Sequence, residues 1–466
     1  MSSSYHFKLP MLGIAVPSTN LAVTTGSIVC LLVLVQWVLQ WVLKQNRLPQ
    51  WPVYNKASPF NPSKAKNNFR QSADELLLNG FSKSPKGYFL DTDVGRQMIL
   101  SPQYADELRN DPRLSFKEFT SRDFSGDLPG FEVFSSKSDA NAIGVDVVRK
   151  KLTRTLGLVT EDISEEMAAV LPEQWSEETE WHEVPLKSTL LEMVARLSSR
   201  VFLGLDVCRN PEWIRITIDY TVNVFMASSA IKRYPKFLHR IANWYLPETR
   251  KIRAQVTEAR RIIQPVIDRR AAAGWVHPGG QGYTDAIQWM HEMSEGRNYD
   301  PAIQQLGLSM AAIHTTTDLV NQILFDICPQ PNLIQALRDE AIEMLKNGGW
   351  KRTGLYKLRL MDSVMKESQR LKPTGLVSMR RYVTEDMTLQ DGVFLPKGSM
   401  LGVSSHWSWG SSSFYENPEK FDGYRFLRMS EDPETEKTAH FVSTSPQHLG
   451  FGYGKHACPG RFFAAN

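Results

Sequence analysis

The chain has 466 residues, of which 42% are hydrophobic and 22% charged, and its 54 basic and 50 acidic residues leave a formal net charge of +4. These values are typical of a globular protein, and they exclude a disordered, collagen-like or low-complexity chain. So small a net charge predicts no nucleic-acid partner. The four cysteines are far apart and form no CxxC pair, which argues against a disulfide scaffold or zinc ribbon and favours reduced thiols in a cytosolic setting.

An uncharged, mostly apolar run, Leu21–Leu43, is the first feature along the chain. A membrane-spanning helix needs about 20 such residues, so this run is long enough to be a single transmembrane anchor. Lys44 and Arg47 follow it directly, whereas only Lys8 precedes it. The positive charge therefore places the following residues in the cytosol and residues 1–20 in the lumen of the endoplasmic reticulum. A cleavable signal peptide and a buried core helix are the alternatives.

A proline-rich stretch separates the anchor from the rest of the chain. Residues 44–62 contain prolines at positions 49, 52, 59 and 62. Prolines at this density favour a stiff extended segment over a helix. We therefore expect a linker here, followed by one catalytic body over residues 63–466.

Helical patterns dominate the body, with short extended pieces at both ends. Two strands across a turn are predicted at 86–91 and 97–100. Prolines at 301, 329 and 331 bracket one of the helices on both sides. The predicted helices are Val145–Leu158, Leu186–Leu205, Glu248–Ala273, Ala302–Ile327, Leu333–Lys346 and Tyr356–Leu371, and the later strands are Met387–Leu389, Val393–Leu395 and Ser399–Val403. The expected fold class is therefore mainly α with small β-sheets.

The segment Tyr234–Pro247 reads YPKFLHRIANWYLP and mixes aromatic and apolar residues with scattered bases. This composition is typical of a segment that lies on a membrane surface. It is equally typical of a buried corner between two helices, and the sequence leaves both interpretations open.

A loop that contains a cysteine near the end of the chain indicates a metal-binding site. Residues 451–460 read FGYGKHACPG, and the glycines among them allow the backbone to fold tightly and to approach a flat partner. Cys458 stands just before the helix-like sequence RFFAA. A cysteine at a helix N-terminus is expected to favour the thiolate, which is the form that binds iron. An inert cysteine beside a glycine turn is the alternative.

These residues resemble the haem-thiolate signature FxxGxxxCxG of the cytochrome P-450 superfamily. The resemblance implies that Cys458 is the axial ligand of the iron in haem b, that Phe451 packs near the haem, and that His456 contacts a propionate. An axial thiolate favours cleavage of the O–O bond. The resemblance also implies the fold of this superfamily, preceded here by one transmembrane helix.

Two further patterns resemble elements of the superfamily. Glu367 and Arg370 are three residues apart on a predicted helix, as in its ExxR element, and Arg425 resembles the arginine that joins them. Three charges that satisfy one another imply a structural lock rather than a catalytic group. Arg381 matches a propionate-binding position, and Arg149 matches the second one, although the usual tryptophan four residues before it is absent.

The helix predicted from residue 302 contains AAIHTTTD and resembles the oxygen-side helix of the superfamily. Ala311 would leave space beside the porphyrin, and the hydroxyl of Thr315 would hydrogen-bond to the bound oxygen and relay protons. His314 stands where the superfamily has an acid. Histidine shuttles protons near neutral pH, and Asp318 lies one turn further along, so both are candidates for the proton route.

The residue sequences of these motifs most resemble those of fungal monooxygenases of the ent-kaurene oxidase type. This resemblance implies a monooxygenase that oxidises an apolar small molecule, a terpenoid or meroterpenoid of secondary metabolism, with electrons from NADPH through NADPH-cytochrome P-450 reductase. Members of the superfamily continue beyond the position of Asn466 with more helix and a strand pair, so we expect the C-terminal end to be missing. A haem enzyme of rearrangement or dehydration, favoured by the change at His314, and a non-catalytic truncated remnant are the alternatives.

Overall fold

The structure, a computed structural model, describes residues 31, 35–36, 48–58, 61–137, 140–277, 280, 282–347, 349–405 and 414–466. The chain divides into two units. The larger contains residues 51–385 and 397–466, and the smaller contains the N-terminal residues and residues 386–396. The predicted anchor, 21–43, lies almost wholly outside the described residues. Among the residues that are described, no helix combines the length and the apolar character that crossing a bilayer requires.

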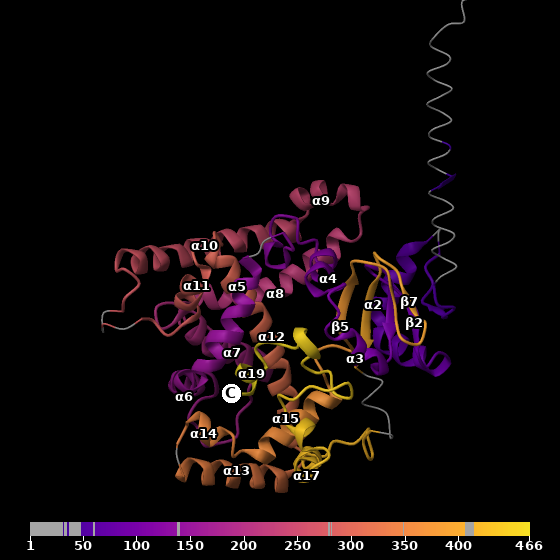
Figure 1. The fold of residues 1–466 in the computed structure, drawn as a ribbon. Coiled ribbons are helices and arrows are strands. Elements are labelled where there is room, and N and C mark those ends of the chain that lie inside the picture. Colours follow the sequence, from indigo (N-terminus) through magenta and orange to yellow (C-terminus); the bar gives the residue numbers. More distant parts are fainter. Residues whose placement is uncertain are drawn as a thin grey trace, which may run out of the picture. The chain divides into compact units, whose positions relative to one another are not determined.

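A six-stranded sheet holds most of the strands of the larger unit, in the order β1-β2-β3-β8-β5-β4 (Figure 1). β2 and β3 pair antiparallel, and β8 lies parallel to β3, so the first and last parts of the body share one sheet. Every residue of β2 is buried, because α2 packs on it through Leu77 and Phe81, which contact Tyr88. The strands are β1 (Val53–Tyr54), β2 (Gly87–Thr92), β3 (Gly95–Leu100), β4 (Leu114–Ser115), β5 (Val377–Val383) and β8 (Met400–Ser404), and α2 is Pro62–Lys83.

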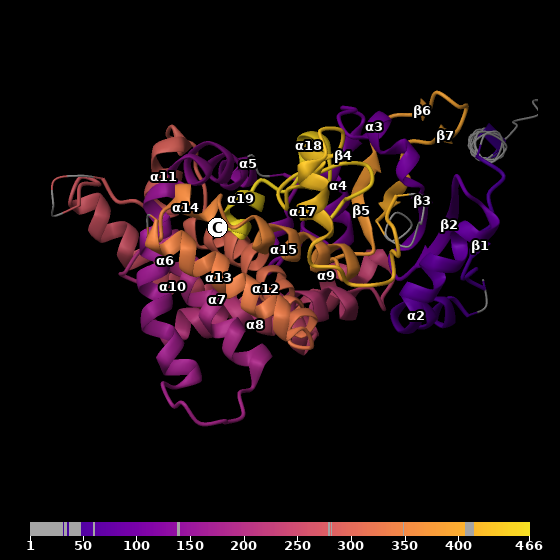
Figure 2. The same cartoon turned by 90° about the horizontal axis from the view of Figure 1, so that it is seen from below.

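Helix α12 (Pro301–Ile327) is the central element of the helical part. Asp300 caps it by accepting hydrogen bonds from the backbone N–H groups of Ala302 and Ile303, and Pro301 occupies a first-turn position that needs no N–H. Its 27 residues make it about 40 Å long. Among the helices that it contacts (Figure 2) are α7 (Leu186–Leu203), α8 (Pro211–Ile231), α10 (Pro247–Ala272) and α15 (Arg359–Leu371).

The remaining elements are short or lie around this centre. In the smaller unit, β6 (Met387–Thr388) and β7 (Phe394–Leu395) pair as an antiparallel hairpin. The other elements of the larger unit are η1 (Pro102–Tyr104), α3 (Ala105–Leu108), α4 (Phe116–Asp123), η2 (Glu132–Phe134), α5 (Ala140–Asp146), the π-helix η3 (Val147–Leu152), α6 (Thr153–Trp175), η4 (Lys236–Leu238), α9 (His239–Tyr245), α11 (Ala286–Ser294), α13 (Pro331–Lys346), α14 (Arg352–Leu355), α17 (Arg425–Glu431), α18 (Glu436–Ala439), η5 (Gly454–His456) and α19 (Arg461–Ala465).

The predicted fold class, mainly helical with small sheets, is confirmed, with differences in several elements. The single helix predicted at 145–158 is three elements, because a π-helical turn at 147–152 interrupts it. Helix α8 and strand β5 were not predicted. The segment 234–247 is not a buried corner, because Phe237, Trp244 and Tyr245 are 80%, 60% and 76% exposed.

Candidate active site

The cysteine loop, residues 451–460, is a tight bend just before α19. Gly452 and Gly454 have left-handed backbone angles, with φ of 72° and 74°. A Cβ atom on Gly454 would lie 2.5 Å from the Cβ of Arg109, so sterics also exclude a side chain there. The backbone N–H of Cys458 donates to the carbonyl of Phe451 at 2.7 Å and closes the bend.

Helix α3 and the residues after it hold the outer side of this loop. The hydroxyl of Tyr453 donates to Asp106 Oδ1 at 2.8 Å and accepts a hydrogen bond from Arg109 Nη1 at 2.7 Å. Asn110 Oδ1 accepts from the backbone N–H of Lys455 at 2.8 Å. Sequence analysis missed these contacts, because nothing in the pattern around residues 106–110 indicates a partner more than three hundred positions away.

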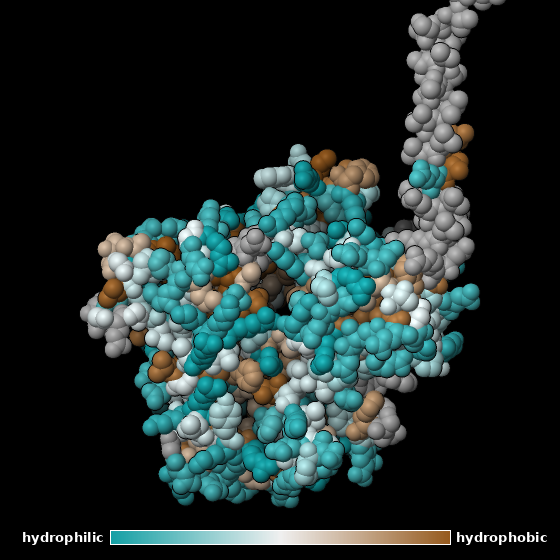
Figure 3. All heavy atoms as spheres, in the orientation of Figure 1, coloured by the Kyte–Doolittle hydropathy of each residue, from teal (hydrophilic) through white to brown (hydrophobic). Residues whose placement is uncertain are grey.

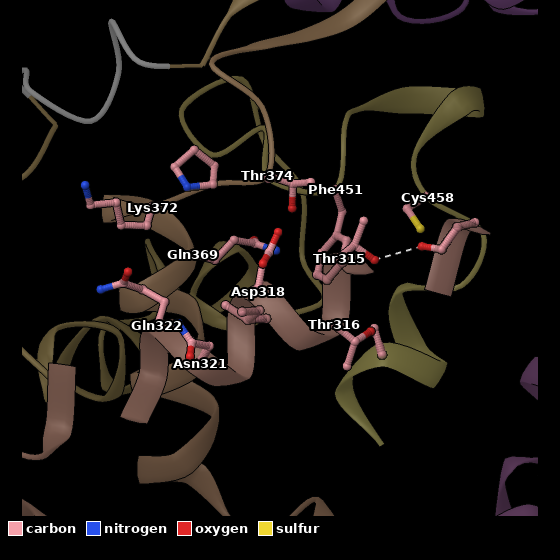
Figure 4. A pocket seen from close by; sticks show the side chains of 15 residues that line it. Thr315, Thr316, Asp318, Asn321, Gln322, Gln369, Lys372, Thr374, Phe451 and Cys458 are labelled. Atoms are coloured by element: carbon pink, nitrogen blue, oxygen red, sulfur yellow. Dashed lines mark hydrogen bonds between the residues drawn. The ribbon is translucent and has the colours of Figure 1, made fainter. Parts of the chain in front are cut away.

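A cavity of about 450 Å³ lies between the cysteine loop and α12, and Figure 4 shows the side chains that face it. Cys458 and Phe451 form one side, and Ala311 and Thr315 come from α12. The end of α15 and the residues after it complete the wall. The full lining is Ala311, Thr315, Thr316, Asp318, Leu319, Asn321, Gln322, Gln369, Lys372, Pro373, Thr374, Gly450, Phe451, Cys458 and Ala464.

Thr315 presents a hydroxyl in this cavity. Its Oγ1 donates to the carbonyl of Ala311, one turn earlier in α12, at 2.7 Å, the bond drawn in Figure 4. A hydroxyl that donates in this way keeps its lone pairs as acceptors. It can also exchange the Ala311 carbonyl for another acceptor by rotating about χ1. Thr315 can therefore hold or pass a proton at the cavity wall.

The structure places the two candidates for a proton route differently. His314 turns toward α8, where Nε2 donates to the carbonyl of Ile218 at 2.9 Å, and it does not line the cavity. Asp318 does line the cavity, and its Oδ1 lies 3.2 Å from Nζ of Lys187. Asp318 thus lines the same cavity as Cys458, whereas His314 has no contact in that cavity that would support the expected proton shuttle.

Buried positive charge lies beside the cysteine loop. Arg381 is 3% exposed, and its Nη1 donates only to the neighbouring carbonyl of Arg380 while its Nε has no partner. Burial lowers the pKa of Arg381 to about 10. Burial, together with the charges of Arg381, Lys455 and Arg149, lowers the pKa of His456 to about 4. Among the described residues no carboxylate pairs with Arg381, so this buried cation lacks an anion.

Glu367, Arg370 and Arg425 meet away from the cavity. Arg370 Nε lies 2.7 Å from Glu367 Oε2, and Arg425 Nε lies 3.0 Å from Glu367 Oε1. Glu367 and Arg370 are completely buried. Further donors of the two arginines bind main-chain carbonyls of the 416–420 segment. The three residues are therefore mutually satisfied and join α15 to the start of α17.

The free thiol of Cys458 has a raised pKa, because burial outweighs the backbone N–H groups of Gly460 and Arg461 and the charge of Arg461, which lower it. The N–H groups at the start of the helix therefore act in the predicted direction, and burial acts against them. A cation bound to the sulfur would be needed to hold the negative form.

Comparison with known proteins agrees with this geometry. Residues 140–466 match the family described as cytochrome P-450. Cytochrome P-450 monooxygenase ntnM of Nectria sp is 51% identical over 425 residues, which cover 91% of this chain and 81% of that protein. Cytochrome P-450 monooxygenase hepE of Aspergillus oryzae is 45% identical over 425 residues, covering 89% and 77%. The solved structure of retinoic acid bound cyanobacterial CYP120A1 has a TM-score of 0.62 at 18% identity, covering 85% and 86%, and so is similar in fold.

The fold and the cysteine cavity thus define a haem-thiolate protein. The chain belongs to the cytochrome P-450 family and is a monooxygenase of that family. Membership implies a haem, a redox partner and a small-molecule substrate.

The residues of the site fit a haem. The orphaned guanidinium of Arg381 suits a propionate carboxylate, which would supply the missing anion. Arg149 lies near the same place, since its Nη2 donates to the carbonyl of Lys455. Cys458 would provide the sulfur ligand, and Ala311, a small residue of α12, lines the same cavity, where a flat ring would lie. Glu367 and its arginines, in contrast, have no free group to offer.

Proposed function

We propose that this chain is a membrane-associated monooxygenase that oxidises an apolar terpenoid or meroterpenoid in secondary-metabolite biosynthesis. One observation carries the catalytic part, namely that Cys458 and Thr315 open on the same cavity from the cysteine loop and from α12. Relatives at 40–51% identity that are named monooxygenases support the type of reaction, and the sequences of the motifs support the substrate class.

Some residues of the site bind the haem, and others deliver protons. Cys458 holds the haem through its sulfur, and Arg381, Arg149 and His456 bind the propionates. When bound, the haem supplies the activation of dioxygen and the oxidation of a C–H bond. Thr315 donates or accepts a proton at Oγ1, and Asp318, one helical turn away, exchanges protons with solvent.

Electrons come from NADPH through an NADPH-cytochrome P-450 reductase in this proposal. A redox partner follows from the family. We expect turnover only when reductase and NADPH are both present. Product formed without either would favour a rearrangement or dehydration enzyme instead.

The proposed location is the membrane of the endoplasmic reticulum, with the catalytic body in the cytosol. The apolar run at 21–43 supports an anchor. The exposed apolar side chains around α9 (Figure 3) support contact with a bilayer, because Phe237, Trp244 and Tyr245 alternate with Lys236 and Arg240. Washing microsomes with alkaline carbonate should leave the full chain in the pellet, and its release would contradict the anchor.

The central test is spectroscopic. The full chain, expressed with haem, reduced and exposed to carbon monoxide, should show the long-wavelength Soret band of thiolate-ligated haem. Cys458→Ser should abolish that band. A wild-type chain without the band would favour a non-catalytic protein.

A further inference from the structure

Lys366, which sequence analysis did not single out, is a buried ammonium group next to Glu367 in α15. It is completely buried, yet it forms no ion pair among the described residues. Its Nζ donates instead to three main-chain carbonyls, those of Thr438 at 2.7 Å, His440 at 2.7 Å and Ser443 at 3.1 Å. Nζ also lies 5.2 Å from the ring centre of Phe426.

The three carbonyls favour the charged form of this side chain. Burial lowers the pKa of Lys366 to about 7, while the charge of Asp362 raises it. Only an ammonium group has three N–H bonds for three acceptors, whereas an amine has two. The contacts therefore oppose the effect of burial, and they fix the path of residues 438–443, which we call the carbonyl segment.

Asp362, one turn before Lys366 on α15, holds the same segment. Its Oδ2 accepts the backbone N–H of Phe441 at 3.0 Å. Two charged side chains of one helix face thus bind four backbone groups of a six-residue segment. This arrangement orders a stretch of chain that has no regular secondary structure after Ala439.

The carbonyl segment contacts the cysteine loop and the start of α19 through two neighbouring residues, Phe441 and Val442. The buried ring of Phe441 packs edge to face on Phe451, with 5.0 Å between ring centres. Arg461, the first residue of α19, donates from Nε to the carbonyl of Val442 at 3.1 Å and from Nη1 to the carbonyl of Cys458 at 3.0 Å. The carbonyl of Phe451 in turn accepts the N–H of Cys458.

We infer that Lys366 is a positioning residue for the cysteine ligand, acting through the carbonyl segment on Phe451 and Arg461. This inference rests on the assignment of Cys458 as haem ligand. The lock formed by Glu367 binds the 416–425 segment, so neighbouring residues of α15 hold two different stretches of chain. Groups that orient a metal ligand from behind typically change metal affinity about 10- to 100-fold when they are removed.

The test compares Lys366→Met with wild type and two control variants in the full-length haem protein. Methionine keeps the length of the side chain but has no N–H group to donate to the three carbonyls. Lys357→Met removes an exposed lysine just before α15, and Asp285→Asn weakens the buried pair of Asp285 with Arg270 between α10 and α11. Haem transfer to excess apomyoglobin and the Soret band of the reduced carbon monoxide complex are measured for each protein. A wild type without the long-wavelength band would refute the proposed function itself, separately from the role of Lys366.

Lys366→Met should lose haem about 10 to 100 times faster than wild type and convert part of the long-wavelength band to a shorter-wavelength one. Lys357→Met should match wild type, and Asp285→Asn should melt earlier with an unchanged band. If Lys366→Met does not fold, Phe441→Leu tests the same connection, because it removes the ring edge on Phe451 and keeps an apolar side chain. The inference would be overturned if folded Lys366→Met lost haem at the wild-type rate and kept an unchanged band. It would also be overturned if Asp285→Asn lost haem as fast as Lys366→Met.

Discussion

Replacing Glu367 with glutamine tests whether charge holds the lock together. The carboxylate accepts from four N–H groups: two of Arg370, the Nε–H of Arg425, which is shared between both carboxylate oxygens, and the backbone N–H of Asp422. Glutamine keeps the shape but presents an N–H₂ group to donors and leaves two buried guanidinium groups without a counter-charge. Removing one partner of a buried ion pair costs about 3–5 kcal/mol.

The size of this loss in a melting experiment follows from the length of the chain. An unfolding entropy of about 2.1 cal/mol/K per residue gives roughly 1 kcal/mol/K for the whole protein, so Glu367→Gln should lower Tm by about 3–5 °C. The measurement is thermal unfolding of the haem-loaded protein followed by circular dichroism. The control is Glu258→Gln, which removes an exposed partner of Arg215 that lies 2.8 Å away and should shift Tm by about 1 °C or less.

A Glu367→Gln shift no larger than that of Glu258→Gln would refute the reasoning. It would mean that the hydrogen-bond pattern, and not the charge, holds the arginines. Loss of haem without a lower Tm would also contradict it, because it would assign Glu367 to the cofactor rather than to the junction of α15 and α17.

Three further outcomes follow from the site and its surroundings. Thr315→Ala should lower product formed per NADPH consumed by up to about 100-fold, whereas Thr315→Ser should retain most of it, since the hydroxyl is what acts. His314→Leu removes the hydrogen bond to Ile218 and should lower the free energy of unfolding in denaturant by about 1–2 kcal/mol. It should leave the product formed per NADPH unchanged. A large drop in product per NADPH would instead support His314 as a proton shuttle. Arg196 and Arg209 lower the pKa of Glu166, so the stability that its ionised form contributes is complete above pH about 4.5 and is lost as pH falls through the lowered pKa. The Tm difference between wild type and Glu166→Gln should therefore shrink below pH 4.5, and a constant difference would contradict the linkage.

Much of the site was visible in the sequence because its chemistry is local. The glycines around Cys458 and the prolines around α12 act within a few residues, through φ angles and missing N–H groups, so a one-dimensional pattern suffices to read them. The lock was predicted from the i, i+3 spacing of Glu367 and Arg370 together with a family resemblance for Arg425. All three meet in the structure.

Other features depended on which segments meet in space. Helical periodicity places His314 and Thr315 on one helix, but the position of α8 decides that His314 faces away from the cavity. The same composition in 234–247 fits a buried corner or an exposed surface, and only the packing of α9 distinguishes them.

The sequence by itself determined the fold class and the bounds of the central helix, because these follow from short-range geometry and apolar periodicity. Tertiary structure alone decided that Lys366 is buried. A lysine is normally expected at the surface, and its burial is tolerated only because three carbonyls from a segment more than seventy residues away converge on its ammonium group. Such convergence is a property of the folded chain, since no local pattern specifies where distant backbone oxygens will point.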